Sequence, residues 1–313
     1  MPSESSAIAA ATTTTIDDLH SDVLTSTLRL LDGPSLAAAC CASSRLRSLS
    51  SQSDLWLHLC LSTWPSLRHP RILPCLSTSP HSFFSDAFPF PNSFVAGEAQ
   101  LPDELLSAVD IYHRGIHIFS RVIETDTSSS WFRGSPFLID AMDQKTEPMI
   151  PRMIISPEDL TMSWILIDPA RGRAVNVSSR RAVAMERNCY TGETMVRFAS
   201  VAAAGERVIR AAVTCGEVTG QVREVVLTAE DIDGGCVSGE EAMKLVWAMM
   251  ESGRKGRGRW EEDEEAKQRY MEYLGKKRRR KESRARREGV LDLCCTAVGV
   301  AVFLGFLSLT VFR

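Results

Sequence analysis

Residues 16–60 read IDDLHSDVLTSTLRLLDGPSLAAACCASSRLRSLSSQSDLWLHLC, and no other stretch of the chain carries so specific a pattern. Leu24, Leu28 and Leu31 recur at i, i+4 and i+7, which places three leucines on one side of a helix. The Gly-Pro pair at 33–34 predicts the end of that helix, because proline has no amide hydrogen and disfavours helical geometry in the residue before it. Two further apolar runs follow. Three short helices of this kind need one another, and a partner, to bury their apolar stripes.

The same segment matches a known family pattern: a leucine-rich first helix, a leucine after a short turn, a cysteine-containing central part and a closing Leu-Trp. The matching residues are Leu19, Val23, Leu24, Leu28, Leu31, Leu36, Cys40, Cys41, Arg45, Leu46, Leu49, Leu55 and Trp56. On these residues the segment resembles an F-box. Two positions depart from the pattern, since His20 stands at the usual proline and Leu46 at the usual tryptophan. The continuation at 59–70, LCLSTWPSLRHP, is similar to that of a group of plant F-box proteins.

The resemblance implies a function without catalysis. An F-box binds the Skp adaptor, which links it to a cullin-RING ubiquitin ligase. The chain would then be the substrate-recognition subunit of an SCF-type (Skp–cullin–F-box) ligase, which holds a target protein near the charged ubiquitin carrier. The residues expected to form the packed and adaptor-binding surfaces are Leu19, Leu24, Leu28, Leu31, Leu36, Leu55 and Trp56. The target itself is not indicated by the sequence.

Charge is distributed unevenly along the chain. The net charge of the 313 residues is −3, yet residues 276–287, KKRRRKESRARR, hold nine basic residues and one acidic residue. This local +8 leaves the rest of the chain at about −11. Basic residues without interleaved aromatics beside an acidic body argue against nucleic-acid binding. The nine cysteines include no C-x-x-C pair, so we expect reduced thiols in the cytosol and no zinc site.

The predicted fold class is α+β, with a small helical F-box, a mainly antiparallel β domain, further helices and a transmembrane helix. The predicted parts are 1–15 disordered, without the features of a signal peptide; 16–62 F-box; 63–108 a Pro/Phe-rich connector that is not one regular element; 109–236 a β-rich target-recognition domain; 238–252 an amphipathic helix; 260–288 a charged helix; and 290–312 a spanning helix.

Alternating apolar residues predict seven to nine strands between residues 109 and 232, without helical crossovers, as in an antiparallel sandwich or barrel-like sheet. The segment 131–143, WFRGSPFLIDAMD, is expected to be a strand interrupted by a Gly-Ser-Pro turn. SWILI at 163–167 and AVNVS at 174–178 predict a hairpin.

Two helices are predicted after the strands. Ser238 and Glu241 form an S-x-x-E capping box at the start of the amphipathic helix. The charged helix at 260–288 has too few apolar residues for a core position. The exceptions are Trp260, Tyr270, Met271, Tyr273 and Leu274.

The last stretch, 290–312, reads VLDLCCTAVGVAVFLGFLSLTVF and holds one charged residue, Asp292. As a helix it would be about 34 Å long, enough to cross a hydrocarbon core of about 30 Å. The basic stretch before it would stay in the cytosol under the positive-inside rule. We therefore expect a single-pass tail anchor that contacts the membrane through 290–312. KKRRRK at 276–281 favours anionic lipids at the membrane surface, with nuclear import as the alternative.

No pattern of catalytic, cofactor-binding or metal-binding residues rises above chance. His113 and His117 are four residues apart, but their surroundings alternate, so we interpret them as exposed strand histidines. Two other functions remain open: a glycan-binding, lectin-like protein and a membrane-tethered structural protein without a ligase role. For the first, Trp131, Trp164 and Trp247 could stack on sugars, although tryptophans in a β domain are more often core.

Overall fold

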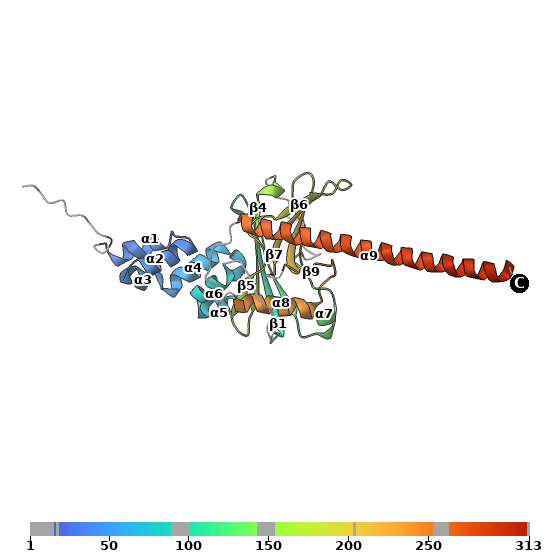
Figure 1. Cartoon of the computed structure of the whole chain (residues 1–313). Helices are drawn as coiled ribbons and strands as arrows, with labels where there is room; N and C mark the ends of the chain where they lie inside the picture. The colour runs from blue at the N-terminus through green and yellow to red at the C-terminus, as the bar shows by residue number, and fades with distance from the viewer. Residues whose placement is uncertain are drawn as a thin grey trace, which may run out of the picture. The chain divides into compact units, whose positions relative to one another are not determined.

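The computed structural model describes residues 16, 19–88, 101–142, 154–202, 205–252 and 263–311 (Figure 1). The chain divides into two compact units, Met1–Phe84 and Ser85–Arg313. The expectation of disorder for 1–15 lies outside the described residues. The architecture is α+β, as predicted: helices at the amino end, antiparallel sheets, and a long apolar helix at the carboxyl end.

The amino-terminal part is a series of short helices. They are α1 (Ser21–Leu28), α2 (Gly33–Ala42), α3 (Ser44–Ser50), α4 (Ser53–Thr63), η2 (Pro65–Arg68), α5 (Leu73–Thr78) and α6 (Pro80–Ala87). The role predicted for the Gly-Pro pair was wrong in detail, because α1 already ends at Leu28 and the pair begins α2. Asp32 caps α2 by accepting a hydrogen bond from the Ser35 amide at 3.0 Å. Proline suits this first turn, where its missing amide hydrogen has no helical partner in any case.

A buried tryptophan lies at the centre of the first unit. Trp56 in α4 is 2% exposed, and its indole Nε1 donates a hydrogen bond to the Ser50 carbonyl oxygen at 2.7 Å. Its ring centroid lies 4.5 Å from that of His81 and 5.4 Å from that of Phe84. The helices of the segment predicted as a connector add further fully or nearly fully buried apolar side chains. These are Leu67, Ile72, Leu76, Phe83 and Phe84.

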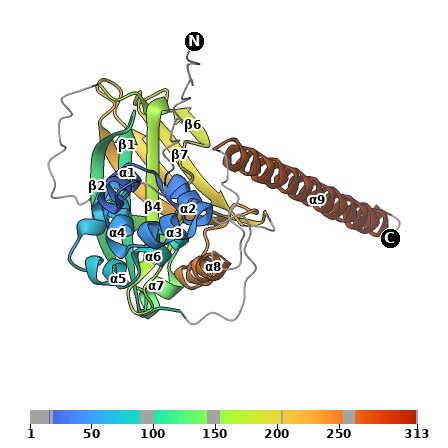
Figure 2. The same cartoon turned by 90° about the vertical axis from the view of Figure 1, so that its left-hand side faces the viewer.

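The second unit contains two antiparallel sheets (Figure 2). The first has the order β2-β1-β4-β5, formed by β1 (Glu104–His113), β2 (Ile116–Asp126), β4 (Leu160–Asp168) and β5 (Arg173–Asn176). The second has the order β3-β9-β8-β7-β6, formed by β3 (Leu138–Asp140), β6 (Ala184–Arg187), β7 (Thr194–Val201), β8 (Arg207–Cys215) and β9 (Val222–Asp231). The described residues thus hold nine strands, and the β4–β5 hairpin pairs as predicted.

The strand predicted around 131–143 was partly wrong. Its first half is the short helix α7 (Ser130–Gly134), and only β3 is a strand. The Ser129 hydroxyl accepts a hydrogen bond from the Phe132 amide at 3.2 Å, which caps α7. A capping serine of this kind starts a helical turn locally, against the alternation of the surrounding sequence. One turn of 3₁₀ helix, η3 (Pro157–Asp159), precedes β4.

The main core of the second unit joins both sheets and one helix. Trp164 from the first sheet and Phe198 from the second are each 0% exposed and belong to the same cluster. Helix α8 (Gly239–Ser252) contributes Val246 and Met249 to it. The helix begins where the capping box predicts, because the hydroxyl of Ser238 accepts a hydrogen bond from a backbone amide in its first turn at 3.3 Å.

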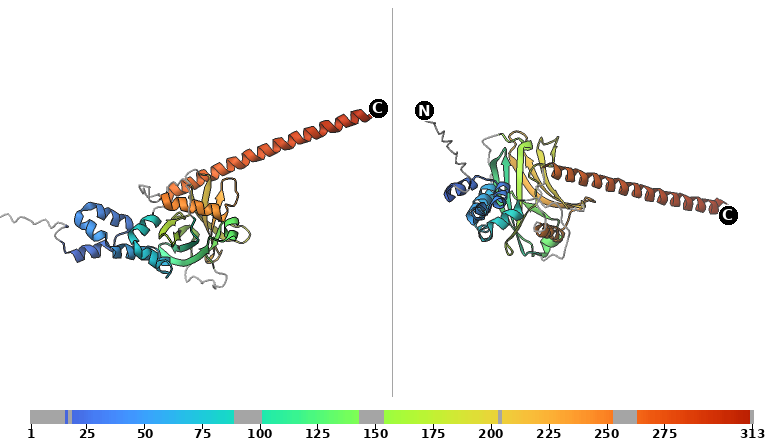
Figure 3. Two further views of the ribbon diagram at one scale, coloured as in Figure 1. Left: turned by 90° about the horizontal axis from the view of Figure 1, so that it is seen from below. Right: turned by 60° about the vertical axis from the view of Figure 1, so that its left-hand side comes forward.

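Helix α9 (Asp263–Val311) is continuous over 49 residues (Figure 3). The two helices predicted at 260–288 and 290–312 are parts of this one helix, which continues through Gly289. A glycine inside a helix costs only about 1 kcal/mol relative to alanine. Arginine, alanine and glutamate before Gly289, and leucine and alanine after it, favour the helix enough to offset that cost.

Candidate functional site

Most of the predicted adaptor-binding residues lie inside the first unit. Five of the seven are 6% exposed or less: Leu24, Leu28, Leu36, Leu55 and Trp56. Leu31 is half-buried, and Leu19 is 38% exposed. The leucine periodicity that points to this segment therefore describes mainly how its helices pack on one another.

A different set of apolar residues is exposed near α1. Leu30 is 86% exposed, Val23 52% and Ile16 57%. The leucine periodicity does not point to Leu30, because this residue lies one position outside the i, i+4, i+7 series, in the turn after α1. The signal that could have identified it is its position beside Leu31: two adjacent leucines on a short helical segment cannot both face the same core.

Local hydrogen bonds fix the backbone that carries these residues. His20, at the usual proline position, caps α1 through its Nδ1, which accepts from the Asp22 amide at 3.3 Å. The guanidinium of Arg45 donates to the Leu19 carbonyl oxygen at 2.5 Å and so ties the entry of α1 to α3. Hydrogen bonds from the Ser35 side chain and amide hold the pKa of the Asp32 carboxyl below its usual range, which keeps the α2 cap ionised.

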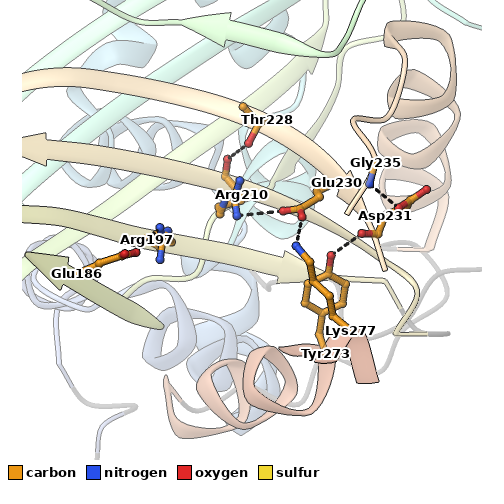
Figure 4. A network of polar contacts seen from close by, with 9 residues as sticks. All are labelled: Glu186, Arg197, Arg210, Thr228, Glu230, Asp231, Gly235, Tyr273 and Lys277. Carbon is orange, nitrogen blue, oxygen red and sulfur yellow. Dashed lines mark hydrogen bonds and ion pairs between the residues drawn. The ribbon is translucent and has the colours of Figure 1, made fainter. Parts of the chain in front are cut away.

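The second candidate site is the first part of α9, where it packs on the second sheet (Figure 4). Tyr270 and Tyr273 are each 2% exposed and form a small core of their own. The other buried members of this core are Val183, Ala199, Val208 and Ile232. The Tyr273 hydroxyl donates a hydrogen bond to the Asp231 carbonyl oxygen at 2.8 Å. The charged helix therefore has a core position after all, built on two tyrosines at i and i+3.

Ion pairs extend this contact along α9 toward its apolar part, residues 290–311. Glu230 on β9 lies between two cations, Lys277 of α9 and Arg210 of β8, whose Nη1 is 3.0 Å away (Figure 4). One turn further along α9, Arg280 pairs with Glu206 at 3.0 Å and with Asp233 at 3.3 Å. Carboxylates at this end of the second sheet thus bind two of the nine basic residues of 276–287.

The remainder of α9 is exposed along its length. Every described side chain from Lys281 to Ser308 is exposed, including Leu293, Phe303 and Phe306, which are 62–70% exposed. By length and composition, α9 is long and apolar enough to cross a membrane. This stretch is exposed to solvent with respect to all the residues that the structure describes, and exposure of apolar side chains to water costs about 25 cal/mol per Å².

The histidines have protein partners. His113 is buried rather than exposed as predicted, and its Nε2 accepts a hydrogen bond from the Ser156 amide at 3.1 Å. His117 Nε2 lies 3.3 Å from the carboxylate of Asp110. Among the described residues, no group of three or more His, Cys, Asp or Glu side chains could hold a metal ion.

The tryptophans weighed for glycan stacking lie in three different environments. Trp131 is 78% exposed on α7, and Trp164 is fully buried in the core. Trp247 lies beneath the guanidinium of Arg171, 4.8 Å from its ring centroid.

All nine cysteines are free thiols. Burial raises the pKa of the Cys60 thiol, in the first unit, to about 12. Burial does the same for the Cys215 thiol in β8. These two thiols stay protonated and unreactive near neutral pH, because the thiolate is the nucleophilic form.

Comparison with known proteins identifies the family. No family model matches the sequence, and no solved structure matches the chain. Three proteins of Arabidopsis thaliana match over nearly their whole length. An F-box protein is 36% identical (95% of this chain, 97% of the relative), a probable F-box protein is 40% identical (98% and 97%), and another F-box protein is 38% identical (93% and 89%). With 36–40% identity over 93–98% of its length, the chain belongs to the family of these plant F-box proteins.

Proposed function

We propose that this protein is the substrate-recognition subunit of an SCF-type ubiquitin ligase, which works at a membrane surface. The observation that carries the proposal is the end-to-end relationship to three F-box proteins, joined to a compact helical unit over the F-box-like residues. In this role the segment 16–62 binds the Skp adaptor, and the β-rich domain at 109–236 binds the target. The protein holds the target beside the charged ubiquitin carrier and catalyses no step itself.

The adaptor contact is best assigned to the exposed residues near α1. A residue that binds a partner must reach it, and Leu30, Val23 and Leu19 expose 86%, 52% and 38% of their surface. Burial of such side chains in an interface contributes about 1.5–3 kcal/mol for each leucine. Leu24, Leu28 and Trp56 support the same contact indirectly, because they hold the helices that present it.

The membrane contact is assigned to α9. Its last 22 residues, 290–311, measure about 33 Å along the axis, against about 30 Å for a hydrocarbon core. Nine basic residues precede them and keep that side in the cytosol. The body then lies on the cytosolic side, and its targets are restricted to proteins that reach this membrane surface.

Leu30→Asp tests the adaptor contact. The full-length protein, purified in detergent, is titrated with the Skp adaptor. A charge at the centre of an interface removes about 2 kcal/mol or more, so affinity should fall at least about 30-fold. Because Leu30 is 86% exposed, the thermal unfolding midpoint should stay unchanged.

Two further variants make the result specific. Val218→Asp, at an 85% exposed position of the second unit, adds the same charge and should leave adaptor affinity unchanged. Leu24→Asp buries a charge at a 6% exposed position and should lower stability and binding together. Full affinity of a folded Leu30→Asp protein would contradict the assignment of the contact.

The anchor is tested separately in cells. The intact chain should sediment with membranes and resist alkaline carbonate extraction, whereas a chain without residues 290–313 should be soluble. Nuclear accumulation of the intact chain would instead favour the import reading of 276–281.

A further inference from the structure

Two pairs among the nine basic residues of 276–287 differ in their ion-pair partners. Of the other five, Arg278 and Arg284 pair with Glu282 and Glu288 of α9 itself. Lys277 and Arg280 are bound to the β domain, through Glu230 in one case and through Glu206 and Asp233 in the other. Arg286 and Arg287 lie further along and make no ion pair with any residue that the structure describes. The two groups are the same size, so each carries two positive charges.

The spacing along the helix gives the two pairs different distances from a bilayer. At about 1.5 Å per residue, Arg286 and Arg287 lie about 5–6 Å before Val290, where the apolar half begins. The polar headgroup layer of a bilayer is about 5–8 Å thick on each side. These two arginines therefore lie at the level of the lipid phosphates when α9 crosses the membrane. Arg280 is about 15 Å from the same boundary, outside that layer.

From this division we infer that α9 is a two-sided connector. Lys277 and Arg280 clamp the acidic end of the second sheet, and Arg286 and Arg287 bind the headgroups of anionic lipids. The inference rests on the proposed membrane anchor and adds to it the lipid class and the residues that recognise it. Guanidinium groups suit this partner because their planar forks match phosphate oxygens.

The clamp has a consequence for the orientation of the β domain. Helix α9 leaves the second sheet beside Glu206, in the turn between β7 and β8, and beside Asp233, in the turn after β9. These turns consequently face the bilayer. Their carboxylates would be repelled by an anionic surface, and Arg280 lowers that repulsion because its positive charge offsets one of the two negative charges. The same residue thus positions the domain and screens its acidic end.

Two double variants that remove equal charge test this inference: R286Q/R287Q at the lipid level and K277Q/R280Q at the clamp. Full-length protein is reconstituted in phosphatidylcholine vesicles that contain phosphatidylserine. Spin-labelled lipids then report how strongly the protein prefers phosphatidylserine over phosphatidylcholine. Hydrogen exchange of peptides from β9 and from the start of α9 reports the clamp.

Each double variant should change one of the two measurements and leave the other nearly unchanged. The native protein should prefer phosphatidylserine about 30-fold, the equivalent of about 1 kcal/mol for each of the two arginines. R286Q/R287Q should bring this preference close to one and leave exchange at the clamp unchanged. K277Q/R280Q should keep most of the preference and speed exchange of β9 and the start of α9.

The outcomes separate this inference from the proposed anchor. Equal loss of lipid preference in both double variants would overturn the division of roles, and unchanged preference in both would overturn headgroup recognition. In either case a protein that still resists carbonate extraction remains anchored. A native protein that carbonate extracts from the vesicles would overturn the anchor itself, and the inference with it.

Discussion

Replacement of Trp56 distinguishes a core tryptophan from an interface tryptophan. The side chain is 2% exposed, and its ring lies against His81 and Phe84. Trp56→Ala leaves a cavity in the first unit and should lower its free energy of unfolding by about 3–5 kcal/mol. A unit of 84 residues has a free energy of unfolding of about 4–13 kcal/mol, so this change removes a large share of it.

Trp56→Phe separates packing from hydrogen bonding. Phenylalanine keeps most of the ring contacts but cannot donate to the Ser50 carbonyl oxygen, which accepts from the indole at 2.7 Å. A buried carbonyl without its partner costs about 1–3 kcal/mol. The expected order of stability is therefore native, then Trp56→Phe, then Trp56→Ala.

Hydrogen exchange of the full-length protein measures this order, through peptides that cover α2 to α4. Protection should fall about 30-fold for a loss of about 2 kcal/mol and about 1,000-fold for a loss of about 4 kcal/mol. Trp131→Ala is the matched control, since that side chain is 78% exposed, and it should change stability by less than about 0.5 kcal/mol. Native protection in Trp56→Ala, combined with loss of adaptor binding, would refute the core assignment.

Two further predictions concern pH and backbone geometry. Burial raises the pKa of Cys60 and Cys215 to about 12 from an ordinary value near 9, so their stabilising effect is complete below pH 9 and is lost as pH rises toward 12. The thermal midpoint should fall over this pH range, and less steeply when both residues are replaced by alanine. An unchanged slope of midpoint against pH in that variant would exclude these thiols as the cause of the fall. Gly220→Ala should lower the midpoint, because Gly220 has φ +65° and a Cβ there would lie 2.0 Å from the Ile155 carbonyl oxygen. Gly134→Ala, with no atom within 4 Å of the added Cβ, should leave the midpoint unchanged, and equal effects of the two would contradict the steric argument.

The fold class was predictable because it depends on local periodicity. Alternation in 194–201 and 207–215 predicts strands, since successive side chains point to opposite faces of a sheet. The order of the strands was not predictable in the same way. β1 pairs with β4, and β3 pairs with β9, across long intervals of sequence that no local pattern specifies.

The candidate site was predictable only as a segment. The leucine series correctly indicates helices in 21–63 but does not distinguish a stripe that faces its own core from one that faces a partner. Trp56 and Leu30 show this limit, because both are apolar and one is buried while the other is exposed. In α9, Tyr270 and Tyr273 were visible as isolated apolar residues in a charged helix, but the surface that receives them comes from four separate segments of the chain.

Because α9 is one unbroken helix, the orientation of the β domain about the helix axis depends on the number of residues between that domain and the apolar part of α9. A helix turns about 100° and advances about 1.5 Å with each residue. One residue inserted between Glu282 and Val290 would swing the sheet about 100° around the helix axis. Four inserted residues would move the sheet about 6 Å along the helix axis and return it to within about 40° of its original orientation. The distance of the β domain from the bilayer and its rotation about the helix axis therefore change together, in steps set by the helical repeat.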